Sequence, residues 1–333
     1  MYGCLFRQLR KDRGLTLQEV ATQTISSVSF ISKFEKEQSD ISVSRLVHLL
    51  DAINVTVEEF LYLYHQQAEK PIFKHLTALP SYISSSFFEN LNCISKINEE
   101  TIVSRDFTLG IQKLDALEHK LDKSTKAQEY TRIYLDIIRE ALRFNQRWTA
   151  ENGDIETKKI ALQLIQEFRE KTGPIIHYLH SVDNWGLFEI TLFRYFQFTF
   201  PPDDVSHLLP IAVTRTKKQQ GLAMMDQLKL DLVFSSFSVF INFDDFIRAK
   251  NSLDLAEKLL REENDFFNST KLKFYQGWYL LAQKDFLNGQ LLCEQAISIC
   301  HILKQKKAEE NYRRMLTTLL KMIDETNSVF FFT

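Results

Sequence analysis

The stretch GLTLQEVATQTISSVSFISKFEKEQSDISVSRLVHLLDAINVTVEEF, which runs from Gly14 to Phe60, decides the fold of the N-terminal part of the chain. Within it, Thr16 precedes apolar residues at helical spacing and is followed three positions later by Glu19. This pairing is a capping box, in which each side chain binds the backbone N–H of the other residue at the start of a helix. A short helix is therefore predicted after Thr16, and its inward residues are Leu17, Val20 and Ala21.

A second short helix is predicted around Ser27–Phe34, with Ser26 or Ser27 as its cap. Its apolar spacing turns Ile31 and Phe34 inward. The outward side chains are Val28, Ser29, Phe30 and, one turn later, Lys33. Ser is only weakly selective among bases, whereas Lys favours guanine or a phosphate.

Two further helices close this unit, one from Ser44 to Ile53 and one from Thr56 to Tyr64. Thr56 and Glu59 form a second capping box. Short helices in this order form a helix-turn-helix, which reads base edges in the major groove with the N-terminal part of its second helix. We therefore expect the unit to bind double-stranded promoter DNA.

A helix from about Cys4 to Arg13 precedes the capping box and carries several cations, which suit phosphate contacts. Residues 1–65 hold seven Lys or Arg and eight Asp or Glu, so the unit has no net positive charge. We therefore expect weak binding by one copy, and a homodimer on two half-sites. The expected DNA-contacting residues are Arg7, Arg10, Lys11, Gln18, Ser27, Val28, Ser29, Phe30, Lys33 and Lys36.

The segments ISKFE (31–35), ISVSRL (41–46) and EEF (58–60) resemble the Xre-type, lambda-repressor-like helix-turn-helix, and in particular the Rgg family of Gram-positive transcription regulators. The resemblance implies that a large all-helical domain of tetratricopeptide-like repeats follows and that this domain binds a short peptide pheromone. The chain departs from the family at two places. Lys36-Glu37 stand where Arg-Gly is common, which predicts a less flexible loop, and Phe30 stands where Gln is common, which predicts an unusual base preference.

Composition favours an almost entirely helical protein of about two domains. The 333 residues include only 9 Gly and 6 Pro, which loops and strands consume, and 27 Phe, which suit helix–helix interfaces. The net charge of −2 implies no bulk attraction to nucleic acid or membrane.

We expect a helix-turn-helix domain at 1–64, a helical linker at 65–71 that stops at Pro71, and a repeat domain at 72–333. Helices are predicted at 72–79, 81–98, 104–123, 125–151, 155–171, 174–180, 184–200, 205–214, 217–242, 243–261, 265–283, 287–304 and 307–326. Helix pairs that cannot bury their faces alone must stack, which predicts an α-solenoid. The expected fold class is therefore all-α.

The tetratricopeptide pattern is clearest near the C-terminus. Its positions, in the order such a repeat uses, are Phe274, Gly277, Trp278, Phe286, Gly289, Ala296 and Ile297. Gly277 inside a helix is costly unless a neighbouring helix packs close to it.

An extended peptide would lie on the concave face of such a solenoid. Asn side chains can pair with a ligand backbone, Arg can bind its carboxylate, and aromatic rings can form pockets. Core packing is the competing interpretation, because aromatic residues at helical spacing usually face the interior. The candidate peptide-binding residues are Asn145, Arg147, Trp148, Trp185, Glu189 and Arg194. The apolar tail Val329–Phe332 is expected to cap the last repeat or to contact a second subunit.

No metal, cofactor or catalytic site is expected. His177 and His180 form an HxxH pair near Asp183, but a third firm ligand is lacking, and no phosphate-binding or hydrolase motif is present. The four cysteines are scattered without a CxxC, so they are expected to be reduced, with Cys293 and Cys300 sharing one buried stripe. No signal peptide and no apolar run of about 18 residues is seen, so we expect a cytoplasmic protein without a membrane partner.

These features favour a DNA-binding transcription regulator that is controlled by a short hydrophobic peptide. The alternative is a peptide- or protein-binding scaffold whose helix-turn-helix serves as a protein contact. The lack of net positive charge in residues 1–65 motivates that alternative.

Overall fold

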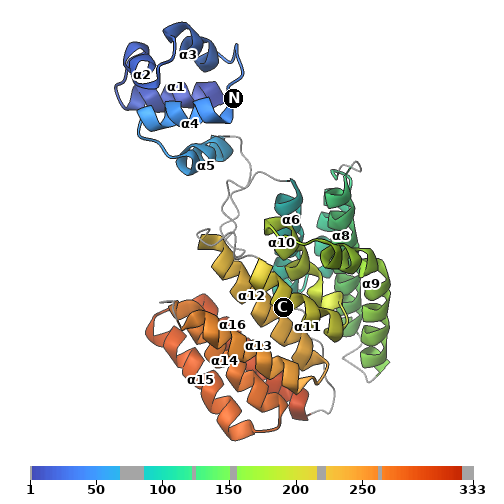
Figure 1. Cartoon of the computed structure of the whole chain (residues 1–333). Helices are drawn as coiled ribbons and strands as arrows, with labels where there is room; N and C mark the ends of the chain where they lie inside the picture. Colours follow the sequence, from blue (N-terminus) through green and yellow to red (C-terminus); the bar gives the residue numbers. More distant parts are fainter. Residues whose placement is uncertain are drawn as a thin grey trace. The chain divides into compact units, whose positions relative to one another are not determined.

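A computed structural model of the chain describes residues 2–67, 86–121, 125–150, 156–215, 223–261 and 265–324. All regular elements in these ranges are helices (Figure 1), which confirms the predicted all-α fold. The chain divides into two compact units, Met1–Ser85 and Ser86–Thr333, called here unit 1 and unit 2, and each is described by itself. The linker after residue 67, the helix predicted at 72–79 and the tail at 329–332 lie outside the described residues.

Unit 1 contains the predicted series of short helices. They are α1 (Tyr2–Asp12), α2 (Leu17–Thr24), α3 (Val28–Glu35), α4 (Val43–Ala52) and α5 (Val57–Gln67). Their apolar faces meet in one core, formed by Leu5, Phe6, Leu9, Val20, Ala21, Ile31, Phe34, Leu49, Leu50, Ile53, Val55 and Phe60. Because the core takes residues from all five helices, it fixes α3 against its neighbours.

Unit 2 is a succession of longer helices. In chain order they are α6 (Ser86–Ser104), α7 (Phe107–Glu118), α8 (Lys126–Ala150), α9 (Glu156–Ser181), α10 (Leu187–Phe196), the 3-10 helix η1 (Gln197–Thr199), α11 (Pro202–Arg215), α12 (Ala223–Asn242), α13 (Phe246–Leu260), α14 (Phe266–Ala282), α15 (Phe286–Ile302) and α16 (Lys306–Asp324). Figure 1 shows α12 to α15 side by side, and successive helices from α11 to α16 contact one another. Since α14 also contacts α12 and α16, these three helices form one layer of the solenoid.

A cap recurs every 20 residues in this part of the chain. Asp245, Asp265 and Asp285 each precede a helix, and each carboxylate accepts the backbone N–H of the residue three positions later. A Phe follows each of these Asp residues, as the first residue of the helix. Asp is a favoured N-cap because its oxygens satisfy N–H groups that the helix leaves unbonded. The regular spacing gives these helices nearly equal lengths, as repeat packing requires.

The predicted glycine crossing is confirmed between α14 and α15. A Cβ atom added to Gly277 would lie 2.7 Å from the Gly289 carbonyl oxygen and 2.6 Å from the Cys293 sulfur. A Cβ added to Gly289 would lie 2.9 Å from the Gly277 carbonyl oxygen. Two glycines thus let the helices approach backbone to backbone, which offsets the cost of Gly inside a helix.

Two helix breaks were predicted in the wrong place. The break expected at 99–103 lies inside α6, which continues to Ser104. A break was also predicted between residue 171 and Pro174, whereas α9 continues from Glu156 to Ser181 with Pro174 inside it. A proline removes one backbone donor and disfavours a helix interior, but tertiary packing overrides this preference. Thr172 and Ile175, on either side of Pro174, are fully buried, and that packing holds the helix together across the proline.

Candidate functional site

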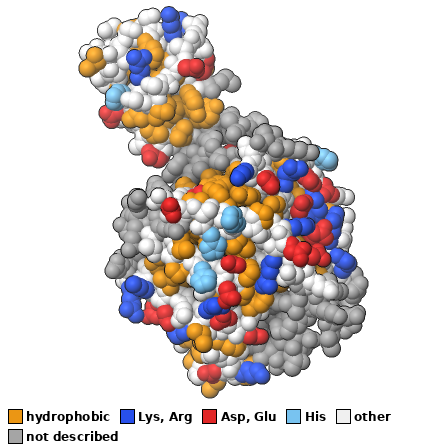
Figure 2. All heavy atoms as spheres, turned by 45° about the vertical axis from the view of Figure 1, so that its right-hand side comes forward, with side chains coloured by type: hydrophobic (Ala, Val, Ile, Leu, Met, Phe, Trp, Pro, Cys, Tyr) orange, Lys and Arg blue, Asp and Glu red, His pale blue; other side chains and the backbone are white. Residues whose placement is uncertain are grey.

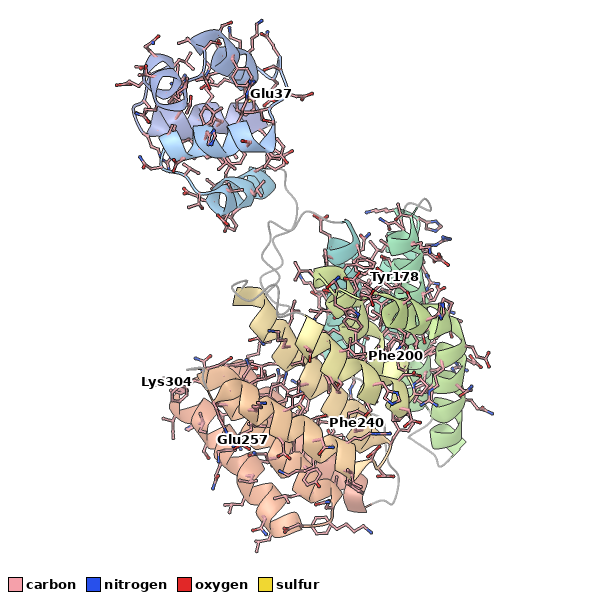
Figure 3. All side chains as sticks on the ribbon, in the orientation of Figure 1. Glu37, Tyr178, Phe200, Phe240, Glu257 and Lys304 are labelled. Atoms are coloured by element: carbon pink, nitrogen blue, oxygen red, sulfur yellow. The ribbon has the colours of Figure 1, made fainter. Side chains whose placement is uncertain are left out.

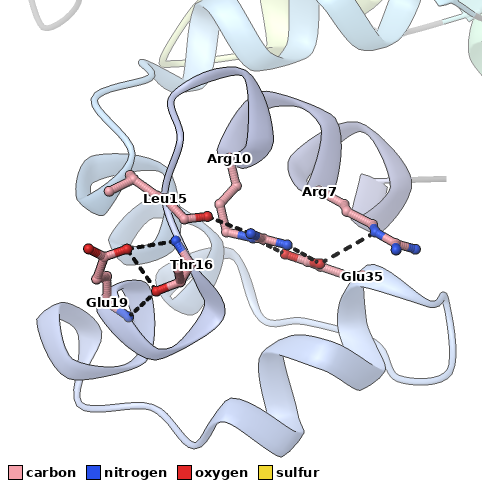
Figure 4. Close-up of polar contacts among 6 residues, drawn as sticks. All are labelled: Arg7, Arg10, Leu15, Thr16, Glu19 and Glu35. Atoms are coloured by element: carbon pink, nitrogen blue, oxygen red, sulfur yellow. Dashed lines mark hydrogen bonds and ion pairs between the residues drawn. The ribbon is translucent and has the colours of Figure 1, made fainter.

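The starts of α2 and α3 are fixed by the caps that the sequence predicted. Thr16 and Glu19 form a complete capping box at the start of α2, in which the Glu19 carboxylate accepts from the Thr16 backbone N–H at 2.7 Å (Figure 4). That contact lowers the pKa of Glu19. At the start of α3, the Ser27 hydroxyl accepts the Phe30 N–H at 3.1 Å. The Ser27 hydroxyl oxygen therefore already accepts a hydrogen bond from the helix backbone. The base contact predicted for Ser27 has to use the same hydroxyl group.

The exposed side of α3 is narrower than predicted. Ser29 and Lys33 are exposed, whereas Val28 and Phe30 are half-buried and pack against the core of unit 1. Only part of the Val28 and Phe30 side chains therefore faces solvent. Ser29 and Lys33 are one turn apart, so they can face one stretch of a groove together.

The prediction that Arg10 contacts phosphate is wrong. Its guanidinium is buried and donates to both oxygens of Glu35, from Nε at 2.6 Å and from Nη2 at 2.9 Å (Figure 4). A third hydrogen bond of 2.6 Å runs from Nη1 to the Leu15 carbonyl oxygen. Glu35 raises the pKa of Arg10. The pair ties α1 to α3 and to the turn before α2, so Arg10 holds α3 in place.

Other predicted DNA-contacting residues are accessible to solvent. Gln18, in the first turn of α2, and Lys11 and Lys36 are exposed. Arg7 is half-exposed, with its Nε 3.9 Å from Glu35. The N-termini of α2 and α3 add partial positive charge, which favours an anion such as phosphate.

Sequence reasoning missed Arg45. This residue lies in the first turn of α4, is exposed, and places its guanidinium carbon 4.9 Å from the centre of the Phe30 ring. Stacking on an aromatic face orients an Arg while leaving its N–H groups free to bind a base or phosphate. The cation is 15 residues from Phe30 in the sequence, so no local spacing signal pointed to it.

The loop after α3 explains the departure from the family pattern at Lys36-Glu37. Glu37 has a left-handed backbone with φ of 58°, a conformation that Gly adopts without strain. The Glu37 carboxylate accepts the Cys4 backbone N–H of α1 at 2.9 Å, and Figure 3 shows Glu37 in unit 1. The side chain thus adds a contact that Gly lacks.

Two predicted peptide-binding residues of unit 2 belong to its interior instead. Trp185 is 1% exposed and packs edge-to-face on Phe193. Glu189 is buried, accepts the Gly186 N–H at the start of α10 and accepts the Tyr178 hydroxyl at 2.7 Å. This hydrogen bond and burial raise the pKa of Tyr178, which Figure 3 labels. The prediction is wrong for both residues, because helical spacing alone does not distinguish a groove wall from a core.

The other four candidates differ in their surroundings. Arg147 is exposed, Asn145 is half-buried, and the Trp148 side chain lies outside the described residues. Arg194 is largely buried, with 15% of its side chain exposed and its Nε 3.9 Å from Asp231. Of the predicted set, Arg194 alone therefore lies beside a buried group of opposite charge among the residues that the structure describes.

No metal site is found in the described part of the chain, where no three His, Cys, Asp or Glu side chains are grouped to hold an ion. His180 Nε2 lies 3.4 Å from an Asp204 oxygen. Cys293 and Cys300 are both buried on α15, as their spacing predicted. Among the described helices, none combines the length and apolarity needed to cross a membrane.

The visible surface carries mixed charge. Figure 2 shows Lys and Arg side chains interspersed with Asp and Glu over unit 2, and hydrophobic side chains gathered on one side of unit 1. Attraction to a polyanion therefore depends on where a few cations stand rather than on a broad basic face.

Family models match both units. The C-terminal domain of the HTH-type transcriptional regulator Rgg matches residues 114–314, and a helix-turn-helix family matches residues 6–60. A curated relative, the 26S proteasome non-ATPase regulatory subunit 6 of Oryza sativa subsp. japonica, is 31% identical over 87 residues, which are 26% of this chain and 22% of that protein. The chain thus matches less than a quarter of that relative.

Solved structures resemble the chain over nearly its whole length. A transcriptional regulator from Listeria monocytogenes EGD-e has a TM-score of 0.70 at 22% identity, covering 97% of this chain and 98% of that chain. The SHP pheromone receptor Rgg2 of Streptococcus dysgalactiae has a TM-score of 0.63 at 21% identity, covering 95% of this chain and 99% of that chain. At these identities the likeness shows a shared fold.

Proposed function

The chain belongs to the family of HTH-type transcriptional regulators Rgg, and we propose from this premise that it binds promoter DNA as a homodimer and is controlled by a short hydrophobic peptide bound to unit 2. One observation carries the DNA-binding half. The caps at Thr16 and Ser27 and the buried Arg10–Glu35 pair fix α3, on which Ser29 and Lys33 are exposed. Arg45 lies over the Phe30 ring of the same helix. An exposed polar edge on a rigid helix is what major-groove reading requires.

The charge of unit 1 supports the proposal that two copies bind DNA together. Arg10 and Glu35 neutralise each other, and Arg13 lies 3.4 Å from Glu59, which leaves five of the seven Lys and Arg of residues 1–65 for DNA. Affinity for DNA rises with the number of phosphates that a protein neutralises. Two copies on two half-sites double that number, and we therefore expect an operator with two related halves.

The DNA-binding proposal is tested by selecting duplexes from a random library with the full-length protein and sequencing those retained. We expect two related half-sites to be enriched. Lys33→Ala then weakens binding to the selected duplex by about tenfold or more, the worth of one good base contact, and weakens binding to a scrambled duplex by less. Lys250→Ala, which changes an exposed lysine on α13, is the matched control.

Two outcomes count against this proposal. Retained duplexes without a common sequence would defeat sequence-specific binding. An equal loss on the selected and scrambled duplexes would show that Lys33 contacts only phosphate.

Fold similarity to a pheromone receptor supports the peptide half of the proposal. A stacked-helix domain offers an extended surface along which a peptide can lie. A peptide that binds one arrangement of the repeats better than another shifts the population of the two, and thereby the activity of the DNA-binding units.

A second candidate function is a scaffold in which unit 1 contacts a protein. Ile25 and Val43 are 98% and 77% exposed in unit 1, and such apolar side chains suit a protein partner. They also suit the methyl group of thymine. Replacing both by Ser separates these functions, because loss of a co-purifying protein without a change in the selected DNA sequence would favour the scaffold.

A further inference from the structure

Three helices of unit 2 bring charged side chains together in its interior. Arg194 comes from α10, Asp231 from α12 and Lys271 from α14, and α12 contacts both other helices. Asp231 is 5% exposed, and the side chains of Arg194 and Lys271 are 15% and 22% exposed. We call these three residues, with Asn268 of α14, the interior charge cluster. A group this well shielded from water must find its bonding partners within the protein or in a ligand.

The ion pairs of this cluster are loose. Arg194 Nε lies 3.9 Å from Asp231 Oδ2, and Lys271 Nζ lies 3.9 Å from Asp231 Oδ1. Hydrogen bonds between such groups are normally about 2.7–2.9 Å long. The charges therefore attract one another across gaps that a hydrogen bond does not bridge.

Three buried atoms in the cluster have no hydrogen-bond partner within the described structure: Arg194 Nε, Asp231 Oδ2 and Asn268 Oδ1. On Asp231 and Asn268, the other polar atom of the side chain is bonded. Asp231 Oδ1 accepts from Gln227 at 3.1 Å, and the Asn268 amide donates to the Gln227 carbonyl oxygen at 2.9 Å. Gln227 thus holds Asp231 and Asn268 in place and leaves one oxygen of each unused. A buried polar atom without a hydrogen-bond partner lowers stability. Here an unbonded donor, Arg194 Nε, lies with two unbonded acceptors, which points to a ligand group that supplies both an acceptor and a donor.

The charge of the cluster is also incomplete. Asp231 and Arg194 are the charged groups that act on Lys271, whose ammonium lies over the rings of Phe234 and Tyr275 at 4.7 and 5.6 Å from their centres. Burial lowers the pKa of Lys271. Around Lys271, two cations therefore share one anion, whereas Glu99 acts with Arg194 and Asp231 on the neighbouring Tyr195. A second anion beside Lys271 would neutralise the excess charge there.

We propose that the interior charge cluster anchors the peptide ligand of unit 2 through a ligand carboxylate, which pairs with Arg194 and Lys271, and an adjacent ligand N–H, which donates to Asp231 or Asn268. A peptide supplies both groups within one residue. The carboxylate is either the C-terminus of the peptide or an acidic side chain, and these two sources share one chemistry. The inference rests on the proposed peptide control of unit 2.

The test uses full-length protein and a pool of synthetic octapeptides built from Leu, Ile, Val, Phe, Gly and Asp. The pool is made in three forms: with a free C-terminus, with a C-terminal amide, and with Asn in place of Asp. Peptides that stay with the protein through gel filtration are identified by mass spectrometry. The affinity of the best binder is then measured for the wild type, Lys271→Met and the surface control Lys250→Met.

We expect the wild type to retain peptides with a carboxylate, and removal of that carboxylate to weaken binding by about tenfold or more, as for one lost charge-assisted hydrogen bond. If the anchoring carboxylate is the C-terminus, the C-terminal amide form binds more weakly. If it is an Asp side chain, the form with Asn in place of Asp binds more weakly. Lys271→Met weakens binding to a similar extent, whereas Lys250→Met leaves it within about twofold. The melting temperature of peptide-free Lys271→Met is unchanged or higher, because residues kept for binding often lower stability.

The outcomes separate this inference from the function on which it rests. If the wild type retains no octapeptide, peptide control fails, and the anchor fails with it. If the wild type binds but Lys271→Met or carboxylate removal changes the affinity by less than about twofold, the anchor alone is wrong. A lower melting temperature of Lys271→Met would show instead that the cluster stabilises the fold, and would also overturn the inference.

Discussion

In unit 1 the guanidinium of Arg10 meets the Glu35 carboxylate in two hydrogen bonds of 2.6 and 2.9 Å, whereas in unit 2 Asp231 lies 3.9 Å from both Arg194 and Lys271. Both groups are shielded from water, but only the first satisfies its bonding capacity. A buried ion pair with complete hydrogen bonds positions the helices that it joins. A buried ion pair with incomplete hydrogen bonds keeps donor and acceptor atoms that can bind a ligand group. The difference supports a structural role for Arg10 and Glu35 and the binding role that we propose for the interior charge cluster.

The largest effect that tests this comparison is expected from Glu35→Ala. The substitution leaves the Arg10 guanidinium buried without its partner, and breaking a buried pair in this way costs about 3–5 kcal/mol. Hydrogen exchange of backbone amides in α1 and α3, measured in the native full chain, reports the free energy of opening of unit 1.

A double substitution controls for the loss of the side chains themselves. Arg10→Met combined with Glu35→Leu replaces the pair by apolar groups, and such replacements are often neutral or stabilising. If Glu35→Ala and the double variant lowered protection equally, the contribution would come from packing rather than from the buried charge.

A second prediction asks whether packing, rather than charge, holds unit 2 together. Gly277→Ala places a methyl group 2.7 Å from the Gly289 carbonyl oxygen, and overpacking of this kind costs about 1–3 kcal/mol. Urea unfolding followed by Trp fluorescence reports unit 2, because Trp148, Trp185 and Trp278 all lie there.

The control for this substitution is Lys258→Ala. Lys258 is exposed in α13, and a surface substitution of this kind changes stability by less than about 0.5 kcal/mol. We expect a clear loss of stability for Gly277→Ala and almost none for the control. Equal stability of the two variants would contradict the close crossing of α14 and α15.

Stability against pH sharpens the contrast between the two clusters. Burial lowers the pKa of Lys271 below its ordinary value of 10.5, so between these two values the unfolded chain binds more protons than the folded chain. The free energy of unfolding of unit 2 therefore rises with pH in that window through Lys271. Glu35 instead raises the pKa of Arg10, which stays charged throughout, and adds no slope there.

The buried tyrosines oppose this slope, because their pKa values are raised and the unfolded chain loses protons first at high pH. The measurement is therefore the difference in free energy of unfolding between the wild type and Lys271→Met, followed by Trp fluorescence from pH about 8 upward. We expect the difference to change in favour of the wild type as the pH rises towards 10.5. A difference that does not depend on pH would show that Lys271 titrates normally.

Local signals explain what the sequence predicted well. A cap depends on residues three positions apart, and Thr16 and Ser27 were therefore identified with their helices. The close approach of Gly277 to α15 followed from the cost of a buried glycine in a helix. Burial of a charged or aromatic side chain depends instead on partners far away in the sequence. Arg10 could not be separated from the exposed cations of α1, because Glu35 is 25 positions away.

The same limit applies to the ligand site. Arg194 was predicted for its charge, but Asp231, Asn268 and Lys271 were missed because three different helices bring the cluster together. Glu189 lies three positions after Gly186 and binds its N–H, but Gly has no side chain that could complete a capping box. The local spacing therefore gave too weak a signal to assign Glu189 to the start of α10.

The smallest expected effect concerns an exposed contact of unit 1. Glu37 combines a left-handed backbone with a hydrogen bond to the Cys4 N–H, one unfavourable and one favourable contribution of similar size. Glu37→Ala loses the hydrogen bond and keeps the strain, so it should destabilise unit 1 by about 0.5–1.5 kcal/mol. Glu37→Gly loses the same bond but relieves a strain of about 1 kcal/mol, so its stability should stay close to that of the wild type. Hydrogen exchange in α1 and α3 ranks the two variants, and Glu37→Gly below Glu37→Ala would mean that the left-handed conformation carries no strain. Because neither variant touches Arg10 or Glu35, both should exchange more slowly in α1 and α3 than Glu35→Ala does, which separates the exposed contact from the buried one within a single unit.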